Sequence, residues 1–165
     1  MASPILQKLA KKQKADKQID LEAQGRLDRI YNGANPVQRE LVDDESNYIS
    51  VRVPRRGGKS FAKTSKVLTV CERIPGARAL IISLTLKSTK GNYWNGPGGI
   101  KHQNHLYSLG LTYNETDSVW YHSNGSRGRL AGAETRADLE YLRGAAAEAD
   151  IVVIDECKSF APDLL

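Results

Sequence analysis

The strongest constraint on the fold of this 165-residue chain is a short segment in its first half. A run rich in β-branched residues, 48–53, is followed by a glycine-bearing turn over 54–58, then by Lys59 and Ser60, and then by a helical pattern from residue 61. This order lets backbone N–H groups enclose the phosphates of a nucleotide, with the lysine reaching the terminal phosphates and the serine hydroxyl available to Mg²⁺. The helix that follows presents its partly positive N-terminus to the same anion. The segment therefore predicts a strand, a phosphate-binding loop and a helix. The residues expected to bind ATP in this loop are Pro54, Arg55, Arg56, Gly57, Gly58, Lys59 and Ser60.

A second motif lies about one hundred residues downstream, where the apolar run 151–154 ends in Asp155 and Glu156. The carboxyl end of a buried strand is where open α/β sheets bind their ligands. Asp155 is expected to hold Mg²⁺ together with Ser60, directly or through water. Glu156 is expected to orient or deprotonate the attacking water. The two motifs together predict a Mg²⁺-dependent ATPase.

Three further residues are candidates for the same site. Arg55, four residues before Lys59, is expected to meet the charge that develops on the γ-phosphate, whereas its neighbour Arg56 can face solvent or DNA. Arg143 is a candidate finger for the nucleotide of a neighbouring subunit, with a surface arginine at a helix end as the equal alternative. Gln38 can offer a donor and an acceptor to an adenine edge, although a surface glutamine is the simpler reading.

Other residues give weaker signals. His102 and His105 can share a metal by spacing, but no cysteine or carboxylate nearby completes a set, so loop histidines are expected. Three lysines near Trp94 can line a DNA track, although a solvated loop over 92–99 is favoured; these lysines are Lys87, Lys90 and Lys101.

Periodicity along the chain predicts an α/β fold. Beyond the strand over 48–53 and the helix from residue 61, buried strands are expected over 77–84 and 151–154, and a hairpin from 119–122 back through residue 130. Strands separated by crossovers favour a mainly parallel central sheet flanked by helices, with right-handed connections.

Composition limits the class of protein. The net charge of +5 favours a polyanionic partner, no apolar run is long enough to cross a bilayer, and the two cysteines suit a reducing compartment. The lysine-rich segment 1–32 is expected to be a basic helical arm, and residues 33–165 are expected to be the ATPase domain.

Four segments resemble the ATPase domain of the tailed-phage terminase large subunit, over about residues 30–160: Asn35-Pro-Val-Gln38, Pro54-Arg-Arg-Gly-Gly-Lys-Ser60, Leu142-Arg-Gly144 and Ile151-Val-Val-Ile-Asp-Glu156. That family tolerates a non-glycine at the start of the loop, as Val53 is here, and carries an arginine four residues before the lysine. The resemblance implies a P-loop NTPase fold of the ASCE (RecA-like) class, with ATP and Mg²⁺ as ligands. It also implies that Gln38 binds the base, that Arg55 acts as a finger in cis, and that Arg143 acts in trans.

By the same resemblance, the protein drives double-stranded DNA into a procapsid as part of a homo-oligomeric ring. Its partners would be the portal protein and the small terminase subunit, at the portal in the host cytoplasm. Family members continue into further ATPase strands and a metal nuclease, whereas this sequence ends nine residues after Glu156. The domain is therefore expected to be truncated after its acidic strand, and nuclease activity is not expected from it. A DEAD-box-like helicase ATPase and an inactive ATP- or DNA-binding fragment are the alternatives, and Val53 and Arg55 favour the terminase.

Overall fold

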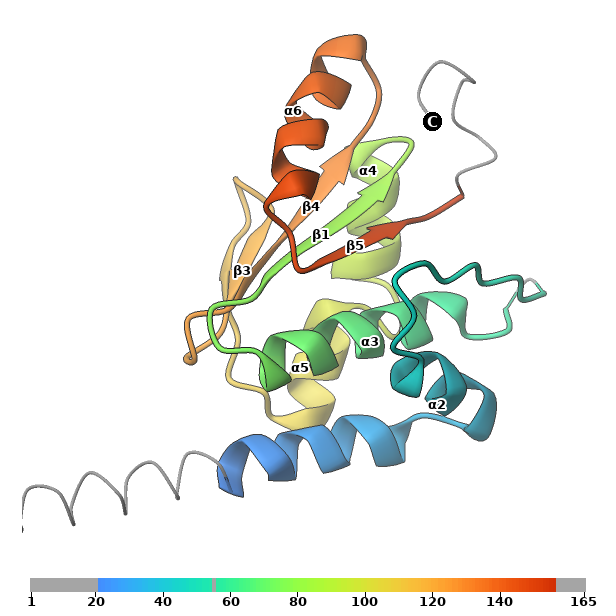
Figure 1. Ribbon diagram of the computed structural model, residues 1–165, viewed down its shortest axis with the longest axis vertical. Coiled ribbons are helices and arrows are strands. Elements are labelled where there is room, and N and C mark those ends of the chain that lie inside the picture. The colour runs from blue at the N-terminus through green and yellow to red at the C-terminus, as the bar shows by residue number, and fades with distance from the viewer. Residues whose placement is uncertain (1–20, 55, 157–165) are drawn as a thin grey trace, which may run out of the picture.

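The computed structural model describes residues 21–54 and 56–156, which form an α/β fold around a five-stranded sheet (Figure 1). A first helix covers residues 21–33. The other helices are α2 (Pro36–Asp43), α3 (Lys59–Arg73), α4 (Leu86–Thr89), the π-helical turn η1 (Lys90–Trp94), α5 (Ile100–Tyr107) and α6 (Arg136–Ala147). The strands are β1 (Arg78–Ser83), β2 (Thr112–Asn114), β3 (Val119–Tyr121), β4 (Arg127–Gly132) and β5 (Ile151–Ile154).

The sheet has the strand order β2-β3-β4-β1-β5 and is mixed. β1 pairs in parallel with β4 on one side and with β5 on the other, whereas β3 pairs antiparallel with both β4 and β2. The predicted hairpin is confirmed, and it is the reason that the sheet is mixed rather than mainly parallel. Its turn is closed by the Gly125 N–H, which donates to the His122 carbonyl at 3.0 Å. Only antiparallel strands can be joined by so short a connection.

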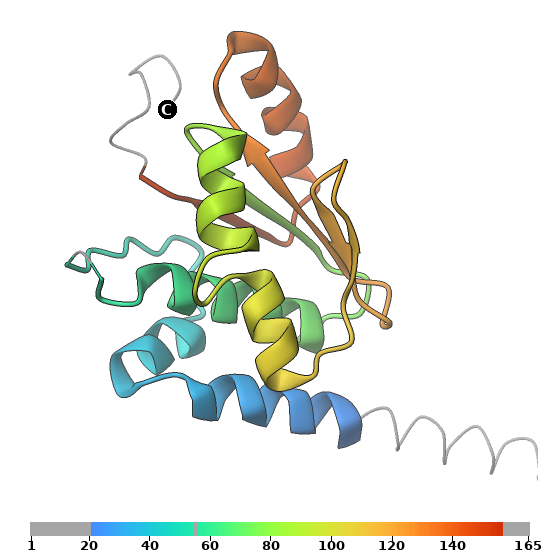
Figure 2. The same ribbon diagram turned by 180° about the vertical axis from the view of Figure 1, so that it is seen from behind.

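Helices cover both faces of the sheet, and the two faces carry separate apolar clusters (Figures 1 and 2). On the face that α3 and α5 cover, Ile81 and Trp120 pack against Val67, Leu68 and Ile100, among others. On the opposite face, α6 is the covering helix, and its buried Leu142 belongs to a smaller cluster with Leu80, Ile82 and Ala131. Alternation of side chains along each strand assigns neighbouring residues to opposite clusters.

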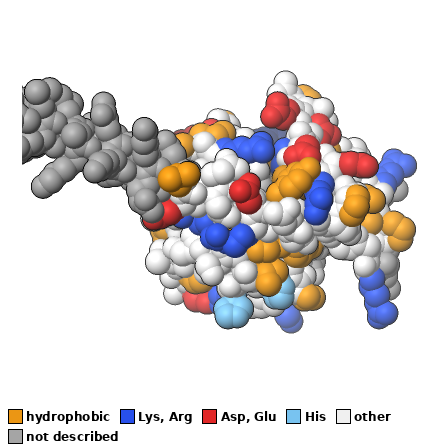
Figure 3. Space-filling model, turned by 90° about the horizontal axis from the view of Figure 1, so that it is seen from below, with side chains coloured by type: hydrophobic (Ala, Val, Ile, Leu, Met, Phe, Trp, Pro, Cys, Tyr) orange, Lys and Arg blue, Asp and Glu red, His pale blue; other side chains and the backbone are white. Residues whose placement is uncertain are grey.

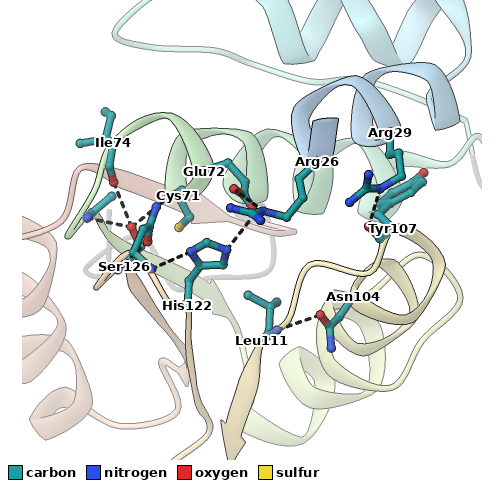
Figure 4. Close-up of polar contacts among 12 residues, drawn as sticks. Arg26, Arg29, Cys71, Glu72, Ile74, Asn104, Tyr107, Leu111, His122 and Ser126 are labelled. Carbon is teal, nitrogen blue, oxygen red and sulfur yellow. Dashed lines mark hydrogen bonds and ion pairs between the residues drawn. The ribbon is translucent and has the colours of Figure 1, made fainter. Parts of the chain in front are cut away.

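A buried ionic cluster joins the first helix, α3 and the β3–β4 turn (Figure 4). Arg26 Nε donates to both carboxylate oxygens of Glu72 at 2.9 Å, and His122 Nε2 lies 3.0 Å from Glu72 Oε1. The other ring nitrogen, His122 Nδ1, accepts from the Asn124 N–H at 3.1 Å. The hydrogen bond to Glu72 raises the pKa of His122, although burial opposes this shift. Charged groups that are removed from water are stable only when they are paired. The contacts of this cluster therefore hold the three segments together.

The strand predicted over 48–53 is wrong. These residues form no regular element and pair with no strand among the described residues. A groove of about 510 Å³ separates this segment from β5, and its walls include Ile49, Val51, Val152 and Ile154. Figure 1 shows the segment running beside β5. β-branched residues favour a strand only where a neighbouring strand supplies the ladder bonds, and here the groove separates the segment from β5.

The loop predicted over 92–99 is only partly a loop, because η1 extends into it. Trp94 is fully buried, so its ring is not available to stack on a base. Its indole N–H donates to the Glu115 carboxylate at 3.0 Å, and Lys101 contacts the same carboxylate. The histidines expected in a loop, His102 and His105, instead lie on α5, where both are exposed.

Two surface properties follow from the described residues. On the face seen in Figure 3, acidic and basic side chains are interspersed rather than gathered into one strip. No helix in the described part of the chain is both long enough and apolar enough to cross a bilayer.

Candidate active site

The two motifs meet in space, because the start of α3 and the end of β5 bring Lys59 to Asp155. Lys59 Nζ lies 3.2 Å from Asp155 Oδ1. A second ammonium, Lys63 Nζ, lies 2.8 Å from the same oxygen and also donates to the Ile154 carbonyl at 3.3 Å. The Asp155 side chain is 3% exposed, whereas that of Lys59 is 31% exposed. The carboxylate is thus fixed inside the protein, while the Lys59 ammonium stands at the surface and can turn toward a ligand.

The net charge around Asp155 favours the binding of an anion. Two ammonium groups contact a single carboxylate, which leaves one positive charge in excess. Burial alone would raise the pKa of Asp155, but the contacts with Lys63 and Lys59 outweigh it and lower that pKa. Asp155 is therefore an ionised acceptor at neutral pH, available to a metal ion as well as to the lysines.

The N-terminus of α3 has neither a side-chain cap nor an acidic residue in its first turn. Its N-cap residue is Gly58, in the left-handed region at φ 76°, and no side chain caps the helix. The first turn contains Lys59 and no acidic residue, although a positive charge there is unfavourable beside the helix dipole. An anion bound at the helix end would accept hydrogen bonds from the unpaired N–H groups of the first turn. It would also compensate the positive charge of Lys59 there.

The loop before α3 is tight and requires glycine at two positions. The Gly57 N–H donates to the Pro54 carbonyl at 3.0 Å, and a Cβ on Gly57 would lie 2.3 Å from Val53 Cγ1. Gly58 needs its positive φ, and Arg56 adopts a left-handed φ of 65° beside it. Arg55, the expected finger in cis, lies outside the described residues. Val53, where the strict motif has glycine, is therefore in direct contact with the turn.

Gln38 lies against the loop that precedes α3. Its Nε2 donates to the Gly58 carbonyl at 3.3 Å, and its Oε1 accepts from the Asn35 N–H at 2.9 Å. Asn35 Oδ1 accepts in return from the Gln38 N–H at 3.0 Å, which completes a capping box at the start of α2. The predicted role in reading adenine stays a prediction, since the amide already braces the loop from α2.

A buried hydroxyl faces the same cluster. Tyr93, on η1, is fully buried, and its hydroxyl has no aligned hydrogen-bond partner among the described residues. Burial raises the pKa of Tyr93, and the neighbouring Asp155 carboxylate raises it further, while Ser60 acts in the opposite direction. The Tyr93 hydroxyl thus lies beside Ser60 and Asp155, the two residues expected to hold Mg²⁺.

The structure places the remaining predicted residues further from this contact. Glu156 follows Asp155 directly and is exposed, with a left-handed φ of 54° that is rare for a non-glycine residue. Arg143 lies on the exposed surface of α6, where it pairs with Glu140 at 2.8 Å. Among the described residues, Arg143 contacts neither Lys59 nor Asp155, so any role in catalysis would require a second subunit.

Two residues of the site were missed from the sequence. Lys63 had a readable signal, because it lies one helical turn after Lys59 and so shares a face of α3 with it. Tyr93 had none, since no spacing relates η1 to the loop or to β5.

The oxygen donors fit Mg²⁺. A carboxylate and a hydroxyl are hard ligands, and Mg²⁺ is commonly held by one or two carboxylates together with substrate phosphates. The described residues contain no group of three or more His, Cys, Asp or Glu side chains that could hold a metal alone. Asp155 and Ser60 are the residues that would hold the ion here.

Comparisons with models of protein families, with curated proteins and with solved structures find no significant match to this chain.

Proposed function

We propose that this chain is the ATP-hydrolysing motor domain of a viral DNA-packaging terminase large subunit, with a P-loop NTPase fold. Such a domain couples ATP hydrolysis to the translocation of double-stranded DNA into a procapsid. The observation that carries the ATPase part is the contact of Lys59, at an uncapped helix start, with the buried Asp155 at a strand end. The terminase part rests on the resemblance of the four sequence motifs. The portal protein, the small subunit, a homo-oligomeric ring and the host cytoplasm belong to this proposal.

Each residue has a role that its position supports. The Lys59 ammonium would move from Asp155 to the terminal phosphates, while Lys63 would stay on Asp155 and keep that carboxylate ionised. Ser60 and Asp155 would hold Mg²⁺, which when bound neutralises charge on the β- and γ-phosphates. The backbone N–H groups at the start of α3 would surround the phosphates, and the Tyr93 hydroxyl would donate a hydrogen bond to the completed site. Glu156 would orient the attacking water.

The decisive experiment compares nucleotide binding and turnover in the full-length chain. Binding of a fluorescent ATP analogue with Mg²⁺, and phosphate release with and without DNA, are measured for the native protein, Lys59→Ala and Glu156→Gln. We expect Lys59→Ala to lose binding, and Glu156→Gln to bind but to lose turnover. Lys87→Ala, which removes an exposed lysine on α4, is the matched control and should behave as the native protein.

Two results would contradict the assignment. Retained binding in Lys59→Ala would show that the α3 end is not the phosphate site. Turnover that persists unchanged in Glu156→Gln would remove the role of Glu156 alone and leave the binding site standing. Circular dichroism of each variant excludes unfolding as the cause of a loss.

A further inference from the structure

The sheet face that α6 covers remains partly open beyond that helix. A trough of about 520 Å³ lies between α6 and β3, over the first residues of β1 and β4. Its charged residues are Arg78, Arg127, Arg129, Glu140 and Glu148, and its exposed rings are Tyr121 and Tyr141. We call this hollow the Arg/Tyr trough.

Strand register places arginine and tyrosine side by side. Arg127 of β4 is registered with Arg78 of β1 and with Tyr121 of β3. Arg129, two residues on, is likewise registered with Val119 of β3. Cross-strand partners and i, i+2 neighbours share one face of a sheet, at a strand spacing of about 4.8 Å. The guanidinium groups and the Tyr121 ring therefore lie in adjacent rows on the same surface.

The positive charge of the trough is not fully compensated. Three arginines and two glutamates line it, which leaves one positive charge in excess. The Arg127 side chain has no hydrogen bond or ion pair with any described residue, whereas Arg78 pairs with Glu148. Arg129 reaches across the trough to the ring of Tyr141, with its guanidinium carbon 5.6 Å from the ring centroid. The excess charge is thus concentrated on β4.

The two tyrosine rings of the trough are exposed to solvent and are not part of the apolar core. Tyr121 is 43% exposed and Tyr141 is 55% exposed. Basic grooves that present exposed aromatic rings bind single-stranded nucleic acid, because cations follow the phosphates while the rings stack on unpaired bases. A duplex can offer phosphates to the same arginines, but its base faces are already stacked and cannot pack on Tyr121.

We propose that the Arg/Tyr trough binds a short segment of single-stranded DNA. Arg127 and Arg129 contact the phosphates, and Tyr121 stacks on a base. The trough begins where β1 and β4 start, whereas the Lys59–Asp155 contact lies where β5 ends, so the two sites use opposite ends of the sheet. The proposal does not depend on nucleotide hydrolysis and can be tested without ATP.

The experiment measures fluorescence anisotropy of a labelled oligonucleotide of about ten thymidines with the full-length chain, over a range of salt concentrations. Matched variants separate charge from stacking. Arg127→Gln removes the unpaired cation, and Lys87→Gln removes a cation from α4, which packs on the opposite face of the sheet. Tyr121→Ala removes the ring, and Tyr121→Phe keeps it.

A third pair of variants blocks the trough without disturbing the core. A Cβ at Gly144, which lines the trough on α6, would meet no atom within 4 Å. Gly144→Glu therefore places a negative charge in the trough, and Gly144→Gln is its neutral counterpart. Both replace a helical glycine by a better helix former, so neither should reduce stability.

The expected results are specific. Arg127→Gln lowers affinity about fivefold at 0.1 M salt and reduces the slope of log K against log salt by about 0.7. Tyr121→Ala lowers affinity by roughly 5- to 150-fold, while Tyr121→Phe stays near the native value. Gly144→Glu weakens binding more than Gly144→Gln, and Lys87→Gln leaves it unchanged.

Four outcomes would overturn the proposal. If the chain binds a duplex of the same length with equal affinity, the trough recognises phosphates alone. Displacement of the oligonucleotide by poly-glutamate at equal charge concentration would indicate an acidic-peptide site. Binding that is lost in Lys87→Gln but kept in Arg127→Gln would place the DNA elsewhere. Absence of binding at low salt by a folded chain would end the proposal outright. Fluorescent ATP binding by the same variants shows separately whether the nucleotide site is intact.

Discussion

Neutralising Glu72 should destabilise the fold more than any other single loss of charge among the contacts described above. Glu72 is 2% exposed, it accepts two hydrogen bonds from Arg26, and its Oε1 lies 3.0 Å from His122 Nε2. Glu72→Gln keeps the shape of the side chain but leaves the Arg26 guanidinium without a counter-charge and His122 Nε2 without an ionised acceptor. Breaking a buried pair in this way costs about 3–5 kcal/mol. The retained amide oxygen still accepts one bond, and Arg26 is 15% exposed, so we expect a loss near the lower limit of that range.

The same variant should change how stability depends on pH. The folded-state pKa of His122 is raised above its ordinary value of 6.5 by the hydrogen bond to Glu72, against the opposing effect of burial. A raised pKa means that the folded state holds the proton more tightly, so this contribution is complete below pH ~6.5 and is lost as pH rises through the folded pKa. Within that window, stability falls by up to about 1.4 kcal/mol per pH unit. Without the Glu72 charge, burial is the larger influence on His122, and this fall should disappear.

Urea unfolding followed by circular dichroism, at intervals between pH 5.5 and 8.5, measures both effects. The window brackets the ordinary His pKa of ~6.5 on both sides. A loss of about 3 kcal/mol corresponds to a fall of roughly 6–12 °C in Tm for a chain of this size. Glu148→Gln is the control, because its ion pair with Arg78 is exposed on both sides and should add nothing measurable. The reasoning would be refuted by a Glu72→Gln variant whose free energy of unfolding lies within about 1 kcal/mol of the native value, well below the expected loss of ~3 kcal/mol, and whose stability keeps the native dependence on pH.

Three further predictions concern single sites. Gly128→Ala would place a Cβ 1.9 Å from the ring of Trp120, so we expect a loss of about 1–3 kcal/mol in urea unfolding, and stability within error of the native protein would contradict that packing. Gly57→Ala would force a Cβ to within 2.3 Å of Val53, so fluorescent ATP binding should fall sharply while Tm, set by the core, stays nearly constant; normal binding would show that the tight turn is dispensable. The pKa of Asp155 is lowered in the folded state despite burial, so its contribution to stability is present above the unfolded pKa of ~3.9 and is lost as pH falls through the folded pKa. Asp155→Asn should therefore flatten the acid limb of stability against pH, and an unaltered limb would mean that other carboxylates cause it.

The sequence was sufficient to predict those elements whose local pattern agrees with their tertiary neighbours. The apolar run 151–154 forms β5 because it is flanked by a turn and by polar residues. The helix predicted from residue 61 is present as α3, which begins two residues earlier, at Lys59, directly after its N-cap Gly58. The hairpin from residue 119 is confirmed, since Asn124 and Gly125 specify its turn. The motifs also indicated which side chains would meet, and the contact of Lys59 with Asp155 follows from placing both at adjoining element ends.

The remaining features depend on partners that no local pattern specifies. Residues 48–53 have strand propensity, but pairing needs a neighbour within ladder distance, and a groove lies there instead. Trp94 sits among glycines and asparagines, yet it is fully buried because η1 turns it toward Tyr113, at a centroid distance of 5.4 Å. The start of α2 had a readable signal, since Asn35-Pro36 followed by Gln38 is a capping-box signature, whereas Gln38 was expected only at an adenine site or on the surface.

The helix α3 carries Lys59 at its first residue and Glu72 one residue before its end. Fifteen helical residues extend about 22 Å, and one flank of this rod is buried along nearly its whole length. Because Lys59 and Glu72 stand on one continuous helix, a displacement of that helix along its axis would move both of these side chains together. The first helix, which Arg26 ties to Glu72, would then be drawn along with the loop before α3.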